Sequence, residues 1–204
     1  QCMQDVSGRD MTQFHHWYDY AGTPRLDIVD EYDAENQRYR LTVTQSCPDT
    51  PGQTDKPPFD IPLHIGLLDQ DGNNMLEQGM LEIKDRQQVF VFDNISSKPV
   101  PSLLRGFSAP VKVNYDYQDE ELMFLMSHDS DGFARWDAAQ NLAQRLLLSM
   151  VEQRRKGLQS GCVRTRRVAV AVLGGRLTGE QRNRSCTSKR DFEPIIALNS
   201  SPWR

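Results

Sequence analysis

The residue types that bind metals or act as nucleophiles are few in this chain of 204 residues, and they are widely spaced. No H-E-x-x-H and no C-x-x-C pattern occurs, so the commonest helical zinc-hydrolase site and the usual zinc-ribbon or redox motif are both missing. Adjacent His15 and His16 would point about 100° apart on a helix, which favours one buried and one exposed ring over a shared metal. We therefore expect ordinary reduced thiols and assign no catalytic, cofactor-binding or metal-binding residue. The histidines and cysteines considered are His15, His16, His64, His128, Cys2, Cys47, Cys162 and Cys186.

Two polar runs resemble ligand sites, and each has a simpler structural interpretation. His128-Asp129-Ser130-Asp131 combines donors suited to a metal or to acid–base chemistry, but Ser or Asp directly before a helix usually caps it. The run Asp69–Gly72 resembles a calcium loop, yet its glycine stands at position four rather than six and no closing Glu follows. We interpret the first run as a helix cap and the second as a tight hairpin turn.

The elements that would position these residues begin with a helix. Residues 3–20 are predicted to be helical, because Phe14, Trp17 and Tyr18 share one apolar face. Gly22 and Pro24 then end the helix.

The middle of the chain changes to the alternating pattern of β-strands. The turn signals between short apolar or alternating runs favour an antiparallel sandwich. The predicted strands are 25–29, 38–45, 61–68, 80–84, 88–92, 111–117 and 121–126.

A second helix is predicted after the polar run 128–131, with one apolar stripe along it. We expect the stripe to pack on its own domain or on the next one, with a partner-docking surface as the alternative. The stripe consists of Phe133, Trp136, Ala139, Ala143, Leu146, Leu147 and Met150.

Residues 99–110 form an unusual loop, because three prolines and a glycine stiffen a segment that also carries large apolar side chains. Such a loop suggests burial against another domain or a ligand surface, and the structural role is preferred. The candidates for interface or core anchors are Leu103, Leu104, Phe107 and Trp136.

Charge is distributed unevenly along the chain. Residues 1–152 carry 12 basic and 25 acidic side chains, residues 153–204 carry 12 basic and 3 acidic ones, and the net charge is −4. The basic tail could bind phosphate backbones, but no nucleic-acid-binding module is recognisable. The apolar run 168–173 is too short to cross a membrane. The first residues lack the features of a signal peptide and do not start with Met, which suggests a cytoplasmic fragment of a longer product.

Several motifs together resemble bacterial aminopeptidase N, a family of zinc gluzincins. The resemblance covers about residues 10–157, with mild departures at Gly132, Ala134 and Asp137. Its main stretches are QFHHWY at 13–18, IPL at 61–63, QVFVF at 88–92, PVPSLLRGFSAPV at 99–111 and HDSDGFARWDAAQ at 128–140.

The resemblance implies an immunoglobulin-like β-sandwich between a catalytic and a helical domain, which agrees with the strand pattern. It implies that 1–22 ends the catalytic domain, 23–128 is the sandwich, and 129–157 begins the helical domain. In this family the zinc ligands and catalytic residues lie upstream, and none of their motifs occurs here. The chain alone is therefore expected to bind no zinc and to hydrolyse no peptide.

The resemblance ends near Lys156, where an Arg-rich segment replaces the expected acidic helices. Residues 158–204 are either translated in a shifted frame or form a genuine divergent tail.

The resulting interpretation is a mainly β fragment flanked by an N-terminal and an amphipathic C-terminal helix. Its parent would be a metalloprotease that removes N-terminal residues from peptides. Its partners would be the catalytic and helical domains of that parent, with no nucleic acid, no membrane, and peptides bound only through the parent. The alternatives are a free-standing β-sandwich binding module and nucleic-acid binding through the basic tail.

Overall fold

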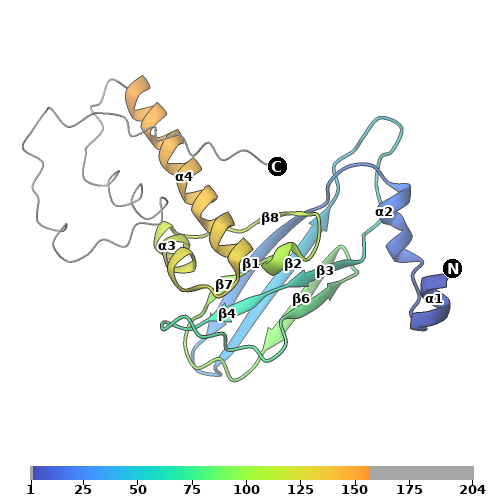
Figure 1. Cartoon of the computed structure of the whole chain (residues 1–204), viewed down its shortest axis with the longest axis horizontal. Helices are drawn as coiled ribbons and strands as arrows, with labels where there is room; N and C mark the ends of the chain where they lie inside the picture. Colours follow the sequence, from blue (N-terminus) through green and yellow to red (C-terminus); the bar gives the residue numbers. More distant parts are fainter. Residues whose placement is uncertain (1, 157–204) are drawn as a thin grey trace, which may run out of the picture.

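The computed structural model describes residues 2–156 of the chain. Figure 1 shows a β-sandwich with short N-terminal helices on one side and a helical pair, α3 and α4, on another. The first helices are α1 (Cys2–Ser7), η1 (Gln13–His15) and α2 (His16–Asp19). The strands are β1 (Arg25–Asp33), β2 (Arg38–Ser46), β3 (Ile61–His64), β4 (Gly66–Leu68), β5 (Met80–Ile83), β6 (Gln87–Phe92), β7 (Val100–Ser102) and β8 (Lys112–Asn114). The remaining helices are η2 (Arg105–Phe107), α3 (Asp119–His128) and α4 (Gly132–Arg155).

Three sheets make up the sandwich. One has the strand order β6-β2-β1-β8, and the others are the pairs β3-β5 and β4-β7. All pairs are antiparallel except β1 with β8, which runs parallel over three residues from Arg25 to Asp27. The predicted mainly β, antiparallel sandwich with flanking helices is therefore confirmed.

Alternation along the strands builds the core. In β1, Leu26 and Ile28 are at most 4% exposed while their neighbours face solvent. In β2, Tyr39, Leu41 and Val43 are fully buried. Removing such apolar surface from water is the main stabilising contribution to the sandwich.

The continuous helix predicted for residues 3–20 is wrong. The chain leaves the helix at Gly8, whose φ of +65° suits the left-handed conformation that glycine tolerates. Asp10 then accepts hydrogen bonds from the backbone N–H and the hydroxyl of Thr12, at 2.9 and 2.6 Å. The second helical piece is fixed separately, because Trp17 donates from Nε1 to the carbonyl of Asp60 at 2.9 Å.

The strand predicted for 61–68 divides at Ile65 into β3 and β4, which pair with different strands. The backbone N–H of Ile65 donates to the carbonyl of Gly79 at 2.7 Å, and the chain then changes partner from β5 to β7. Strand β7 was not predicted, because Pro101 in its centre argues against a strand.

The strand predicted for 121–126 is also wrong, because these residues lie in α3. The helix begins with a capping box between Gln118 and Glu121, and three acidic residues occupy its first turn. Leu122 and Leu125, three residues apart, provide its buried face.

Helix α4 buries a different face from the predicted apolar stripe. Its buried residues are Ala134, Ala138 and Leu142, and the last two pack in one cluster with Leu122 and Leu125 of α3. The stripe predicted from the spacing of apolar residues lies elsewhere on the helix, and Trp136 and Leu147 in it are 57% and 61% exposed. Ala134 and Ala138 on the buried face are small, which allows close packing there.

Candidate functional site: the joint between sandwich and helices

The histidines do not converge on a metal site. His15 is exposed, whereas His16 is half-buried with Nδ1 2.9 Å from the carbonyl of Pro58. His128 is exposed and stacks on Phe124 with ring centroids 4.6 Å apart. Among residues 2–156, no three His, Cys, Asp or Glu side chains could hold a metal ion together.

The other polar candidates have structural roles or lie beyond what is described. Asp69 closes its turn by accepting from the backbone N–H groups of Asp71 and Asn73 at 2.9 and 2.8 Å. The hydrogen bond from the Asn73 backbone lowers the pKa of Asp69, in agreement with a turn role. Cys47 is a free thiol. Cys162 and Cys186 fall outside the described residues.

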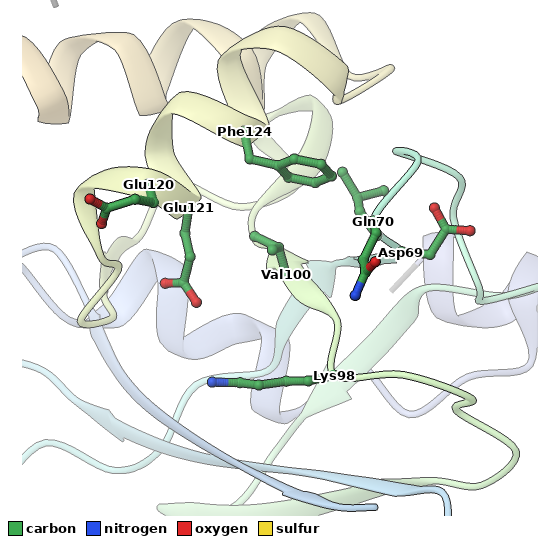
Figure 2. A pocket seen from close by; sticks show the side chains of 8 residues that line it. Asp69, Gln70, Lys98, Val100, Glu120, Glu121 and Phe124 are labelled. Atoms are coloured by element: carbon green, nitrogen blue, oxygen red, sulfur yellow. The ribbon is translucent and has the colours of Figure 1, made fainter.

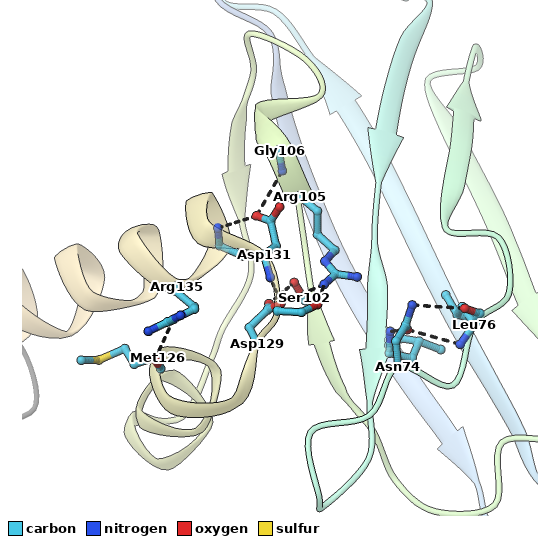
Figure 3. Close-up of polar contacts among 12 residues, drawn as sticks. Asn74, Leu76, Ser102, Arg105, Gly106, Met126, Asp129, Asp131 and Arg135 are labelled. Carbon is cyan, nitrogen blue, oxygen red and sulfur yellow. Dashed lines mark hydrogen bonds and ion pairs between the residues drawn. The ribbon is translucent and has the colours of Figure 1, made fainter. Parts of the chain in front are cut away.

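The polar run 128–131 lies where the helices meet the sandwich, and it does more than cap a helix. Asp131 is the N-cap of α4 as predicted, since its Oδ1 accepts from the backbone N–H of Ala134 at 2.8 Å. The same oxygen accepts from the backbone N–H of Gly106 at 3.1 Å, which joins the cap to η2 (Figure 3). One carboxylate thus holds both the start of α4 and the loop of the sandwich.

Asp129 forms a buried ion pair that the sequence did not reveal. Its Oδ1 is 2.9 Å from Nη2 of Arg105, and the two side chains are 0% and 9% exposed. Its other oxygen accepts from the hydroxyl of Ser102, and Oδ1 also accepts from the backbone N–H of Asp131 at 2.8 Å. Arg105 donates further to the hydroxyl of Ser130 at 2.6 Å. The carboxylate therefore connects β7, η2 and the α3–α4 turn (Figure 3).

Backbone geometry and close packing fix Arg105 in this position. Leu104 directly before it and Phe107 two residues after it have φ values of +56° and +51°, which few non-glycine residues adopt. Across from it, a Cβ added to Gly66 would lie 2.8 Å from Nη1 of Arg105. A side chain at Gly66 would thus force the guanidinium of Arg105 to shift from its observed position.

A second set of contacts strengthens the joint through Tyr117. Its hydroxyl donates to the carbonyl of Pro101 in β7 at 2.7 Å. Its own carbonyl accepts from Nη1 of Arg145 in α4 at 2.6 Å. Burial raises the pKa of Tyr117 well above its usual range, so the phenol stays neutral.

The four predicted anchors fall into two classes. Leu103 and Leu104 are 8% and 7% exposed and belong to the core. Phe107 and Trp136 are 51% and 57% exposed and are not core residues. They flank Phe133, with ring centroids 5.1 and 5.9 Å from it, and so form an aromatic patch on the outside of the joint.

This arrangement is suited to holding elements together rather than to covalent chemistry. Ser102 and Asp129 form a hydroxyl–carboxylate pair, but Ser102 is fully buried and no substrate can reach it. The residues brought together from three elements form a fixed polar connection between the sandwich and the helical pair.

Comparisons with known proteins agree with this architecture. Residues 22–116 match the domain of unknown function DUF3458, described as an Ig-like fold, and residues 119–185 match DUF3458_C, described as ARM repeats. The chain is 41% identical over 164 residues to aminopeptidase N of Escherichia coli, a match covering 77% of this chain and 19% of that protein. It is 43% identical over 157 residues to aminopeptidase N of Haemophilus influenzae, covering 73% of this chain and 18% of that protein.

Among solved structures, a crystal structure of Legionella pneumophila aminopeptidase A in complex with aspartic acid is similar. Its TM-score is 0.65 and its identity 31%, over 73% of this chain and 17% of that one. The chain thus spans about a fifth of the length of the curated relatives it matches. In the described residues, no helix has both the length and the apolar character to cross a membrane.

Proposed function

Because this chain belongs to the aminopeptidase N family, we propose that it is a non-catalytic segment of a zinc-dependent aminopeptidase. Its Ig-like sandwich and first helices would hold the catalytic and helical domains in a fixed relation. The removal of N-terminal residues from peptides, and the zinc that supports it, would belong to the rest of the parent enzyme. The division into 1–22, 23–128, 129–157 and 158–204 remains a prediction, and the last segment lies outside the described residues.

The buried pair of Arg105 and Asp129 is the observation that carries the proposal. A buried charge is costly unless its partner stays in place. Moving the helices away from η2 would separate Asp129 from Arg105 and leave each charge without its partner. An apolar contact could slide at little cost, whereas this one has fixed donors and acceptors. The joint therefore favours one angle between α3–α4 and the sandwich.

Helix α4 also offers a surface for the helical domain. Trp136 and Leu147 lie on an apolar face of α4 that is exposed, whereas another face of the helix packs on α3. Units of a helical repeat bury their apolar faces by stacking on the next unit, and the ARM-repeat match continues to residue 185, past the end of α4. We propose that the helical domain of the parent covers this face.

The first test is enzymatic and uses the purified 204-residue chain with added zinc. The substrates are fluorogenic amides of L-alanine and L-leucine, and full-length Escherichia coli aminopeptidase N is the positive control. We expect no turnover above the blank. Zinc-dependent hydrolysis by the chain, lost on chelation, would contradict a non-catalytic role.

The second test concerns the bracing role and uses amide hydrogen exchange of the same chain. If the joint is rigid, the amides of Leu122 and Leu125 in α3 should exchange with the same opening free energy as those of Leu41 in β2. Much faster exchange in α3, with β2 protected, would show that the helices open independently. A free-standing binding module would not require this coupling.

A further inference from the structure

A pocket of about 340 Å³ lies beside the joint, where α3 crosses the ends of β4 and β7. Its volume is at the lower end of the range for small-molecule sites. Figure 2 shows Glu121 and Phe124 reaching toward it from α3, with Lys98 on the opposite wall and Val100 between them, while the Glu120 side chain points to the side. The residues that line it are Leu68, Asp69, Gln70, Lys98, Val100, Glu120, Glu121 and Phe124.

The floor of the pocket is apolar and held in place by the fold. Leu68 is 1% exposed and lies directly opposite Val100 in the antiparallel pair of β4 and β7. Phe124 is half-buried, and its ring stacks on His128. Leu68 supports this floor from below, and the half-buried Val100 and Phe124 are the apolar surface that a ligand could contact without rearrangement.

The charged groups on the walls are of opposite sign but do not neutralise one another. Within residues 2–156, neither Lys98 nor Glu120 makes an ion pair or a side-chain hydrogen bond. One oxygen of Glu121 accepts from the backbone N–H of Gln118 at 2.8 Å, which leaves the other oxygen free. Asp69 is different, because its carboxylate is used by its own turn. The ammonium group of Lys98 and the carboxylate of Glu121 thus face the pocket, and the exposed Glu120 lies at its edge.

We propose that this pocket binds a free amino acid with an apolar side chain. Lys98 would receive the carboxylate of the ligand, Glu120 and Glu121 would receive its ammonium group, and Phe124 would contact its side chain. A simple anion would be repelled by the carboxylates, and a simple cation by Lys98. A neutral apolar molecule would desolvate charged groups without pairing them. The proposal rests on the pocket alone and holds whether or not the chain belongs to a peptidase.

The experiment is a titration of the isotope-labelled 204-residue chain with L-leucine, followed by amide chemical shifts. We expect saturable shifts at Val100, Phe124 and the first turn of α3, with a Kd in the millimolar range. N-acetyl-L-leucine lacks the ammonium group and L-leucinamide lacks the carboxylate, so each should bind about tenfold more weakly.

Variants separate the site from non-specific binding. Lys98→Gln should weaken L-leucine about tenfold and abolish its preference over L-leucinamide. Glu120→Gln should reduce the preference over N-acetyl-L-leucine. Lys112→Gln, an exposed lysine on β8 away from the pocket, is the matched control and should change nothing. The proposal is overturned if no saturable shifts occur, if both analogues bind as well as L-leucine, or if Lys98→Gln behaves as Lys112→Gln does.

Discussion

Replacing Asp129 by asparagine tests the joint most directly. The amide keeps the shape of the carboxylate but removes its charge, and the Arg105 guanidinium, 9% exposed, is left without a counter-charge. Removing one partner of a buried ion pair costs about 3–5 kcal/mol. The total stability of a domain is only about 5–15 kcal/mol, so this is a large fraction of it. With a urea dependence of about 2 kcal/mol per molar, the unfolding midpoint should fall by roughly 2 M.

The assay is urea unfolding followed by circular dichroism, with an exposed pair of the same chemistry as control. Nε of Arg38 lies 2.7 Å from Oδ1 of Asp93, but the two side chains are 49% and 59% exposed. Asp93→Asn should therefore cost less than about 1 kcal/mol.

A double-mutant cycle then separates the unpaired charge from lost packing. Arg105→Met on the Asp129→Asn background removes the stranded charge, so the double variant should be more stable than the sum of the single effects by about 2–3 kcal/mol. The reasoning fails if Asp129→Asn costs no more than Asp93→Asn, or if the two joint substitutions are additive.

Three further predictions use the same unfolding assay. Gly66→Ala should cost about 1–3 kcal/mol, because the new methyl group would lie 2.8 Å from Arg105, and the cost should shrink in the Arg105→Met background. Leu142→Ala should lower the free energy of unfolding by about 2–5 kcal/mol, because Leu142 packs on α3. Leu147→Ala should change it by no more than about 0.5 kcal/mol, because Leu147 is 61% exposed in the described part of the chain. Burial raises the pKa of Tyr117, so above about pH 10 the folded chain keeps the phenol proton while the unfolded chain loses it. The free energy of unfolding therefore falls as the pH rises through this range. Tyr117→Phe should remove about 1.4 kcal/mol per pH unit from that alkaline slope.

The sequence predicts the strands where one face of a sheet is buried and the other is exposed to solvent, because apolar and polar residues then alternate. In residues 38–45 the apolar positions alternate with polar ones and are buried. In residues 25–29 the structure buries Leu26 and Ile28 but leaves Val29 64% exposed. The division of 61–68 was not predictable in this way, because Ile61, Ile65 and Leu67 are all buried and the period gives no sign of the change in partner.

The helix α3 was missed because a short apolar run, ELMFLM at 121–126, suits a strand and a helix equally well. Its start does contain a helix signal, since Gln118 and Glu121 form a capping box and acidic residues fill the first turn. The cap is therefore the signal in this sequence that distinguishes a helix from a strand at 121–126.

The joint could be predicted only in part. Asp131 precedes a helix in the sequence, so its role as a cap follows from local chemistry. The pairing of Asp129 with Arg105 depends on two segments 24 residues apart in the chain, and no local pattern relates them. The stiffness of residues 99–110 indicated a packed loop, but not which side chain in it would be charged and buried.

A polar joint is a costly way to stabilise a fold, and this cost bears on what the joint does. Apolar residues of similar volume at Arg105 and Asp129 would often give equal or greater stability. They would not distinguish one angle of α4 from nearby angles, because apolar contacts have no direction. Hydrogen bonds from Ser102, Arg105 and the Asp131 backbone converge on one carboxylate, and each requires its donor to approach along a restricted direction. The role that we propose, holding neighbouring domains in a fixed relation, needs direction more than stability, and the hydrogen bonds at this joint have direction.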